Sequence, residues 1–226
     1  MVDVGGSGGF GDLTVDSFVE RLASAEPVPG GGAASAVAAS LGAALVAMVA
    51  GLSQGRERYA AHAATHEEAL HVGRELAARF LSLADEDAAA YAGFAAALKL
   101  PRATEGEQAA RTESIHATAR VAAEVPLRCV EACLDLVRAT EALAGRGNRN
   151  ASSDLTVASL LGEAAARGAA ANVLVNLPSV GDEEYADRLR ARVMDLLDEI
   201  EALGLQTREA VLSGADRPPL PPHEWR

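Results

Sequence analysis

The sequence is poor in aromatic residues, lysine and cysteine. Only eight of its 226 residues are Phe, Tyr or Trp, and Lys99 is the single lysine. The two cysteines, Cys129 and Cys133, are four positions apart, which places them on one face of a helix and argues against a disulfide framework. We therefore expect two small buried side chains and a protein of the reducing cytoplasm.

Basic residues are also scarce relative to acidic ones. Asp and Glu number 32 against 20 Lys and Arg, which gives a formal net charge of −12 at pH 7. The chain has no basic stripe that would track a phosphate backbone, so nucleic acid is not an expected partner. The Gly-rich start has neither the basic residues nor the apolar stretch of a signal peptide.

The sequence is unusually rich in alanine. The chain contains 50 alanines, and hydrophobic residues make up 49% of it. Alanine is the best helix former and is depleted in strands, so the composition predicts an all-α fold and disfavours β-sandwiches and barrels. Such small side chains imply a core in which helix backbones approach closely. The length predicts one domain that buries a full core without metals or disulfides.

A long uncharged stretch stands out near the start of the chain. Residues 1–12 are predicted to be flexible, and Thr14 caps a short helix. Residues 27–53 then contain no charged side chain. This stretch has the length of a membrane span, but it is rich in Ala, Ser and Gly, stands alone and lacks a basic flank. We instead predict a central Ala-rich helix over 33–52 that other helices surround on all sides, with no membrane partner.

Proline and capping residues indicate the later boundaries. An amphipathic helix is predicted up to Leu98, and the capping-box spacing of Thr104 and Glu107 begins the next one. Pro126 inside that helix predicts a kink or a local break. Two further helices are predicted over residues 154–177 and 182–203. The whole domain, a compact multi-helix bundle with kinked long helices, is predicted over 13–203, and a Pro-rich tail follows over 204–226.

The four asparagines all lie between Asn148 and Asn176. Asn172 and Asn176 share one helix face in an otherwise apolar segment, where buried amides need hydrogen-bond partners. They either tie helices together or recognise a heteroaromatic ligand through the amide donor and acceptor. Asp154 lies on the same face but about 27 Å away along the helix. A site that contains all of them is therefore extended or assembled from two subunits.

An acidic triplet precedes Tyr91 by one helical turn. Asp87 and Tyr91 are four positions apart, with three alanines between them. A carboxyl group among alanines can have a raised pKa and move protons near neutral pH, although a solvated position is equally compatible with the pattern. For Asp85 and Glu86 a solvated acidic patch is favoured.

Three consecutive glycines precede the uncharged helix. Gly30, Gly31 and Gly32 suit a helix N-terminus whose free N–H groups receive an anionic or carbonyl group. Neither a following Lys-Ser/Thr nor a preceding strand is present, so they form neither a phosphate loop nor a dinucleotide fingerprint. His62 and His66 have metal-ligand spacing, but we favour a structural or surface role on an exposed face and predict no metal site.

Six short motifs follow one another across residues 12 to 203. They are Pro27-Val-Pro-Gly-Gly-Gly-Ala-Ala-Ser-Ala, Asp85-Glu-Asp-Ala-Ala-Ala-Tyr91, Leu98-Lys-Leu-Pro101, Gly147-Asn148, Ser153-Asp154 and Asn172-Val-Leu-Val-Asn176-Leu. Together they resemble the formiminotetrahydrofolate cyclodeaminase / methenyltetrahydrofolate cyclohydrolase family. The resemblance implies a compact all-α homodimer that binds folate at the glycine loop and acts on a C–N bond of a tetrahydrofolate derivative.

The resemblance also implies roles for individual residues. Asp87 would act as general base and acid, and Lys99 would serve the folate carboxylate tail or assist ammonia departure. The substrate would be bound by Gly30, Gly31, Gly32, Tyr91, Asn148, Asp154, Asn172 and Asn176, the asparagines reading the pterin edge. No metal or cofactor is implied. The cyclodeaminase reaction is the first expectation and the cyclohydrolase reaction the alternative, while a folate-binding or helical assembly module without catalysis is the competing hypothesis.

Overall fold

The computed structural model describes residues 8–221 and residue 225, and these residues form helices without a strand. The α-helices are α1 (Val15–Leu22), α2 (Gly31–Ser53), α3 (Ala63–Leu98), α4 (Glu105–Leu143), α5 (Ser152–Asn176) and α6 (Glu183–Ser213). Short 3-10 helices lie between them: η1 (Phe10–Asp12), η2 (Glu57–His62), η3 (Arg149–Ala151) and η4 (Leu177–Ser179). The all-α prediction is confirmed.

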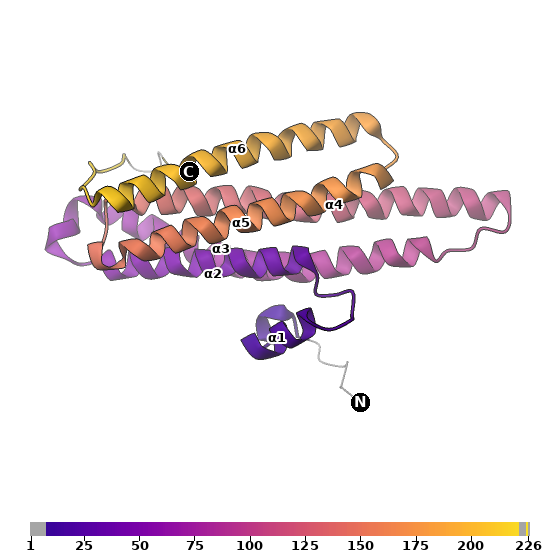
Figure 1. Cartoon of the computed structure of the whole chain (residues 1–226), viewed down its shortest axis with the longest axis horizontal. Coiled ribbons are helices and arrows are strands. Elements are labelled where there is room, and N and C mark those ends of the chain that lie inside the picture. The colour runs from indigo at the N-terminus through magenta and orange to yellow at the C-terminus, as the bar shows by residue number, and fades with distance from the viewer. Residues whose placement is uncertain (1–7, 222–224, 226) are drawn as a thin grey trace.

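The five long helices lie side by side along the long axis of the molecule (Figure 1). α2 packs mainly on α3 and α5, α4 packs on α3 and α5, and α6 packs on α4 and α5. The far ends of α3 and α4 project beyond the other helices, and α1 stands off the bundle (Figure 1). The expected close approach of backbones is present: a Cβ added at Gly73 of α3 would lie 2.8 Å from the carbonyl oxygen of Ala43 in α2.

Helix α2 is buried on one side and exposed on the other. Its alanines at 33, 36, 39 and 43 are in the core, whereas Leu41 is 57% exposed and Met48 is 41% exposed. Burial on all sides, as expected from the uncharged sequence, is therefore wrong, because α3, α4 and α5 leave one face of α2 uncovered. By length and composition α2 could cross a membrane, but half of its apolar window is buried inside the bundle.

The ends of the chain differ from the predicted ones. Of the flexible stretch predicted over 1–12, residues 1–7 lie outside the described residues, and Phe10–Asp12 form η1. At the other end α6 continues past the predicted end at Leu203 to Ser213, because Val211 and its neighbours pack against the core, and Gly214 ends the helix with φ 60°. Of the Pro-rich tail, residues 222–224 and 226 lie outside the described residues.

Capping and packing within α4 follow the sequence closely. Thr104 and Glu107 make both hydrogen bonds of the predicted capping box. The helix runs through the buried Pro126 without interruption, so the local break does not occur. Cys129 and Cys133 are free and buried, as expected.

Candidate functional site

The N-terminus of α2 meets the middle of α3. Gly30 is the N-cap residue of α2 and offers no side chain to the first turn. A Cβ added at Gly32 would lie 2.4 Å from Oδ1 and 2.5 Å from Oδ2 of Asp87. Only a glycine at this position lets the Asp87 carboxyl group reach the first turn of the helix.

The Asp87 carboxyl group takes the place of the missing cap. It is half-buried and accepts a hydrogen bond from the backbone N–H of Ala33. Burial raises the pKa of Asp87 above its ordinary value, and the hydrogen bond from Ala33 lowers it by a smaller amount. A carboxyl group whose pKa is raised holds its proton more readily than a solvated one, and proton exchange is what a general acid and base must do.

Helix α5 supplies the third side of this region. A Cβ added at Gly31 would lie 3.8 Å from Nδ2 of Asn172, and that Nδ2 donates to the carbonyl oxygen of Gly168 at 2.9 Å. The structure gives Oδ1 of Asn172 no hydrogen-bond partner among the described residues. Ser35, which our sequence reasoning did not single out, donates to the carbonyl of Gly31 at 2.8 Å. Its position one turn after Gly31, within the glycine motif, was the signal that could have found it.

Asn176 has a structural task in the same helix. Its Nδ2 donates to the carbonyl oxygen of Ala122 in α4 at 2.9 Å and to that of Asn172 at 2.8 Å. One amide proton therefore joins α5 to α4, which is the helix-to-helix contact weighed from the sequence, and the other bonds within α5. Its Oδ1 remains as the atom that a ligand can use.

Tyr91 and Lys99 follow Asp87 along α3. They lie about 6 Å and about 18 Å from it along the helix axis, and both side chains are exposed. Lys99 is the C-cap residue of α3, at the projecting end of the helix. The half-buried Asp87 and the exposed Tyr91 and Lys99 are therefore spread along α3 rather than gathered around a closed cavity.

Asn148 and Asp154 lie at the opposite end of the bundle. The backbone N–H of Asn148 donates to Oγ of Ser53, the last residue of α2, at 2.8 Å. The Asn148 side chain accepts from the N–H of Asn150 and caps η3, and Asp154 is in the first turn of α5. Because α2 has 23 residues, about 33 Å separate these side chains from Gly31. A single copy of the chain does not bring the two groups together.

The acidic neighbours of Asp87 each contact another element. Both are half-buried, and each has a defined partner. Oδ1 of Asp85 accepts from the backbone N–H of Phe10 at 2.8 Å, and Glu86 pairs with Arg128 at 2.6 Å. The solvated interpretation is therefore wrong for Asp85, on which η1 packs, whereas the Glu86 side chain stays 38% exposed in its ion pair with Arg128.

The paired histidines lie at the end of the bundle that carries Asn148. His66 is 1% exposed, so the expectation of an exposed face is wrong for it. Its Nε2 is 2.8 Å from the carbonyl oxygen of Arg146 and donates to it, since a carbonyl oxygen only accepts. Burial lowers the pKa of both His62 and His66. The described residues contain no group of three His, Cys, Asp or Glu side chains placed to hold a metal ion.

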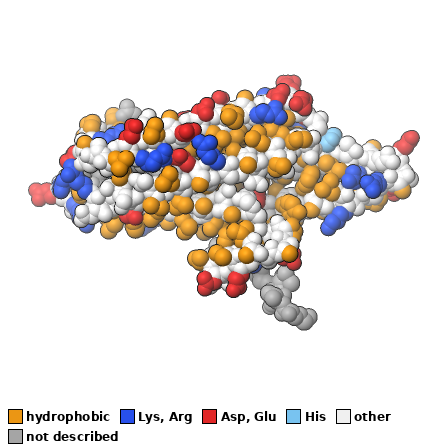
Figure 2. Space-filling model, in the orientation of Figure 1, with side chains coloured by type: hydrophobic (Ala, Val, Ile, Leu, Met, Phe, Trp, Pro, Cys, Tyr) orange, Lys and Arg blue, Asp and Glu red, His pale blue; other side chains and the backbone are white. Residues whose placement is uncertain are grey.

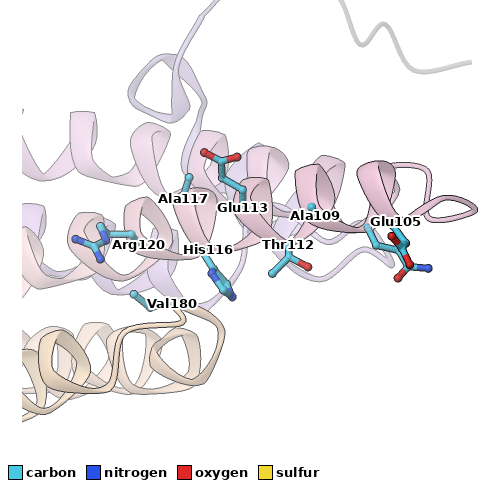
Figure 3. A pocket seen from close by; sticks show the side chains of 9 residues that line it. Glu105, Ala109, Thr112, Glu113, His116, Ala117, Arg120 and Val180 are labelled. Carbon is cyan, nitrogen blue, oxygen red and sulfur yellow. The ribbon is translucent and has the colours of Figure 1, made fainter.

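A surface groove lies elsewhere and contains none of the predicted site residues. It has a volume of about 720 Å³ and lies between the first half of α4 and Val180. Figure 3 shows Thr112 and His116 on the side of α4 that faces Val180, with Glu113 on the opposite side. The groove is shallow and open, so we place the candidate site at Asp87 and the α2 N-terminus instead.

Comparison with known proteins shows what kind of protein has this arrangement. A family model described as formiminotransferase-cyclodeaminase matches residues 14–195. The chain belongs to this family. The solved structure of formiminotetrahydrofolate cyclodeaminase from Thermotoga maritima superimposes with a TM-score of 0.81 at 26% identity, covering 90% of this chain and 98% of that one.

Curated members of the formiminotransferase-cyclodeaminase family carry two names. Methenyltetrahydrofolate cyclohydrolase of Methylorubrum extorquens is 35% identical over 203 residues, which cover 90% of this chain and 98% of that protein. Formimidoyltransferase-cyclodeaminase of Rattus norvegicus is 35% identical over 202 residues, 88% of this chain but 37% of the rat protein. The family resemblance of the six motifs is confirmed, and both named reactions belong to folate one-carbon chemistry.

Proposed function

We propose that this chain is an enzyme that acts on a C–N bond of a tetrahydrofolate derivative, and that its reaction is that of a formiminotetrahydrofolate cyclodeaminase. The observation that carries the proposal is the carboxyl group of Asp87, which is half-buried, has a raised pKa and lies on the first turn of α2. Beside it, Gly30 and Gly31 present backbone without side chains, and Asn172 offers an amide oxygen to the polar edge of a ligand ring.

In the cyclodeaminase reaction, N10 of 5-formiminotetrahydrofolate, whose formimino group is protonated, attacks the formimino carbon and forms a tetrahedral centre. The ionised Asp87 carboxylate takes the proton from N10 and delivers it to the departing amino nitrogen. The C–N bond then breaks, ammonia leaves, and 5,10-methenyltetrahydrofolate carries the positive charge. The negative charge of the carboxylate stabilises this cation, and Asp87 is again ionised at the end of the reaction.

The cyclohydrolase reaction uses the same parts in another order, and it is the second candidate. Water attacks the methenyl carbon, and the Asp87 carboxylate takes a proton from that water. The bond from the carbon to N5 breaks, N5 takes up one proton, and 10-formyltetrahydrofolate and one net proton are released. The specific observation that favours this candidate is the relative of similar length from Methylorubrum extorquens, which bears the cyclohydrolase name.

Substrate conversion by Asp87→Asn tests the proposal. Asn keeps the shape of the side chain and can still accept from Ala33, but it cannot carry a proton, so turnover should fall by about 10²–10⁴-fold while folate binding is retained. The assays follow the absorbance of the methenyl compound, with 5-formiminotetrahydrofolate and with methenyltetrahydrofolate as separate substrates. Undiminished turnover in the variant rejects Asp87. Binding of folates without conversion of either substrate by the unchanged protein favours the non-catalytic module.

We also propose that the chain works as a homodimer in which two copies complete each site. The proposal accounts for two observations together. One face of α2 exposes Leu41 and Met48 although the helix has no charged residue. Asn148 lies at the opposite end of α2 from Asp87, and an antiparallel pair of α2 helices across a two-fold axis would bring such opposite ends together.

Mixing two inactive variants tests the shared site. Asp87→Asn and Asn148→Ala would each be inactive alone. In a mixed dimer, one of the two sites would combine an intact Asp87 with an intact Asn148, so random exchange should restore about a quarter of the unchanged activity. Controls are the same variants mixed without exchange of subunits. A dimer in which mixing restores nothing would show that each copy holds its own complete site.

A further inference from the structure

The loop that carries Asn148 is bound on its inner side by two helices. We call residues 144–148, which follow α4, the Asn148 loop. The backbone N–H of Asn148 donates to Oγ of Ser53 in α2 at 2.8 Å. Nε2 of His66 in α3 donates to the carbonyl oxygen of Arg146 at 2.8 Å. These contacts fix the inner side of the loop, and its outer side is covered by another segment.

The segment that covers the loop is the chain that follows α6. We call residues 214–218 the strap; α6 ends at the end of the bundle where α2 also ends and α5 begins (Figure 1). The backbone N–H of Arg217 donates to the carbonyl oxygen of Gly145 at 2.9 Å. In the other direction, Nε of Arg146 donates to the carbonyl oxygen of Pro218 at 2.7 Å. Strap and loop thus each donate a hydrogen bond to the other, across 72 positions of sequence.

Two arginines attach the strap and the loop to the end of α4. The last carbonyl groups of a helix have no N–H partners within the helix. Arg146 is 3% exposed, and its Nη1 donates to the carbonyl oxygen of Ala142 at 3.0 Å. From the strap, Arg217 donates to the carbonyl oxygen of Ala144 at 3.3 Å and pairs with the carboxylate of Glu141. Both cations lie at the negative end of the helix dipole, which stabilises them there.

Gly145 permits the close approach of strap and loop. Its φ of 73° is in the left-handed region, and a Cβ at this position would lie 2.7 Å from the carbonyl oxygen of Ala215. A cavity of about 170 Å³ is lined by Asn148 of the loop and by Ala215 of the strap. Arg149 of η3 pairs with Asp216 of the strap at 3.0 Å, and Figure 2 shows basic and acidic side chains side by side at this end of the molecule. The strap thus supplies part of the wall of the cavity that Asn148 lines.

We propose that Arg217 is a positioning residue for Asn148, and that the strap holds the Asn148 loop in the arrangement that the proposed site needs. The strap is bonded to Gly145 and Arg146, which come shortly before Asn148, so a shift of either residue moves the Asn148 side chain. The inference rests on the site proposed above, in which Asn148 of one copy serves the Asp87 of the other. A displaced Asn148 weakens that site, because a misplacement of about 1 Å can lower the rate of an enzyme by about 100-fold.

Arg217→Ala tests the positioning role, and Arg138→Ala is the matched control. Both arginine side chains are 30% exposed, but the pair of Arg138 with Glu199 joins α4 to α6 and involves neither loop nor strap. Arg217→Ala should lower kcat/KM by about 10–100-fold and speed the amide hydrogen exchange of residues 145–151 at least about tenfold, with exchange in α3 unchanged. Arg138→Ala should leave both quantities within about threefold of the unchanged protein. Full turnover by Arg217→Ala, or unchanged exchange in the loop, would overturn the proposal.

Mixed dimers show whether the loss acts through Asn148. Arg217→Ala keeps Asp87, so mixing it with Asp87→Asn should bring the activity to about a quarter of that of the unchanged protein, because one site of each mixed dimer combines an intact Asp87 with an intact loop. Mixing Arg217→Ala with Asn148→Ala should add nothing, since every loop is then impaired. A variant that is only less stable would behave alike in both mixtures, and that result rejects the positioning role.

The same variants separate this inference from the function on which it rests. Full turnover by Asn148→Ala, or no recovery when it is mixed with Asp87→Asn, rejects the proposed shared site and the inference with it. An inactive Asn148→Ala beside a fully active Arg217→Ala rejects the positioning role alone. If circular dichroism shows that Arg217→Ala does not fold, Arg217→Lys takes its place, because lysine keeps the charge but lacks the fork that reaches carboxylate and carbonyls together. Loop exchange in Arg217→Lys equal to that of the unchanged protein then contradicts the proposal.

Discussion

Replacing Gly32 by alanine adds one methyl group at the point where α2 meets Asp87. The new carbon would lie 2.4–2.5 Å from Oδ1, Cγ and Oδ2 of Asp87. Atoms do not approach so closely. The new carbon is fixed to the helix backbone, whereas the Asp87 carboxyl group can rotate about its side-chain bonds, so it must turn away from the helix. The turn breaks its hydrogen bond with the N–H of Ala33. We expect turnover to fall by about 10²–10⁴-fold, the usual contribution of a positioned acid or base.

The same substitution has opposite local effects on stability. Alanine in place of glycine favours the helix by about 0.5–1 kcal/mol, whereas crowding in a well-packed place disfavours it by about 1–3 kcal/mol. We therefore expect Gly32→Ala to lower the free energy of unfolding in urea by about 1–2 kcal/mol. When Asp87 is already alanine the crowding disappears, and the same change at Gly32 should be neutral or slightly stabilising.

Two controls separate crowding from a general effect on the helix. Gly93→Ala in α3 would place its Cβ 3.9 Å from the nearest atom of Thr118, an ordinary contact, and should leave turnover within about threefold of the unchanged protein. In the Asp87→Ala background, Gly32→Ala should not lower activity further. Full turnover by Gly32→Ala in the otherwise unchanged protein would refute the placement of Asp87 at the helix N-terminus as the working arrangement.

Three other outcomes are expected. Because burial raises the pKa of Asp87 in the folded chain, the ionised carboxylate opposes folding. Stability is therefore lost as the pH rises from the unfolded pKa to the folded pKa. Melting curves should show Asp87→Asn gaining stability over the unchanged protein at neutral pH and losing that gain in acid. Asn176→Ala, which removes the donor to Ala122, should lower the free energy of unfolding in urea by about 1–2 kcal/mol, and an unchanged midpoint would mean that the contact adds nothing. Arg217 donates to the carbonyl of Glu141 at 3.2 Å and pairs with its carboxylate; Arg217→Ala should lower the melting temperature by several degrees in calorimetry, whereas no shift would show that the tail is not bound to α4 in solution.

Several features of the fold follow from short-range patterns and were predictable. Thr14 and Thr104 begin helices because a hydroxyl oxygen can accept from the N–H groups of the first turn, a contact that spans three residues. The all-α class follows from the alanine content. Where a local signal competes with long-range packing it can fail, as at Pro126, where a helix buried on α3 and α5 continues despite the missing N–H.

The surroundings of each side chain required contacts between distant segments. The alanines next to Asp87 are compatible with a buried or a solvated carboxyl group. Packing against Gly32 of α2, more than fifty positions earlier in the chain, buries it in part. His66 was expected on an exposed face and is buried under the loop that contains Arg146, 80 positions away. Spacing along one helix carries no information on which helix covers it.

The chain's own pattern of small, apolar and capping residues thus determines where helices form, because helix formation depends on contacts within about four positions. Tertiary packing decides which helix N-terminus receives Asp87, why Asn148 lies at the other end of the bundle, and which face of α2 stays uncovered. These outcomes depend on contacts between helix backbones that form only when the chain folds. The glycines and alanines of the sequence permit this close approach.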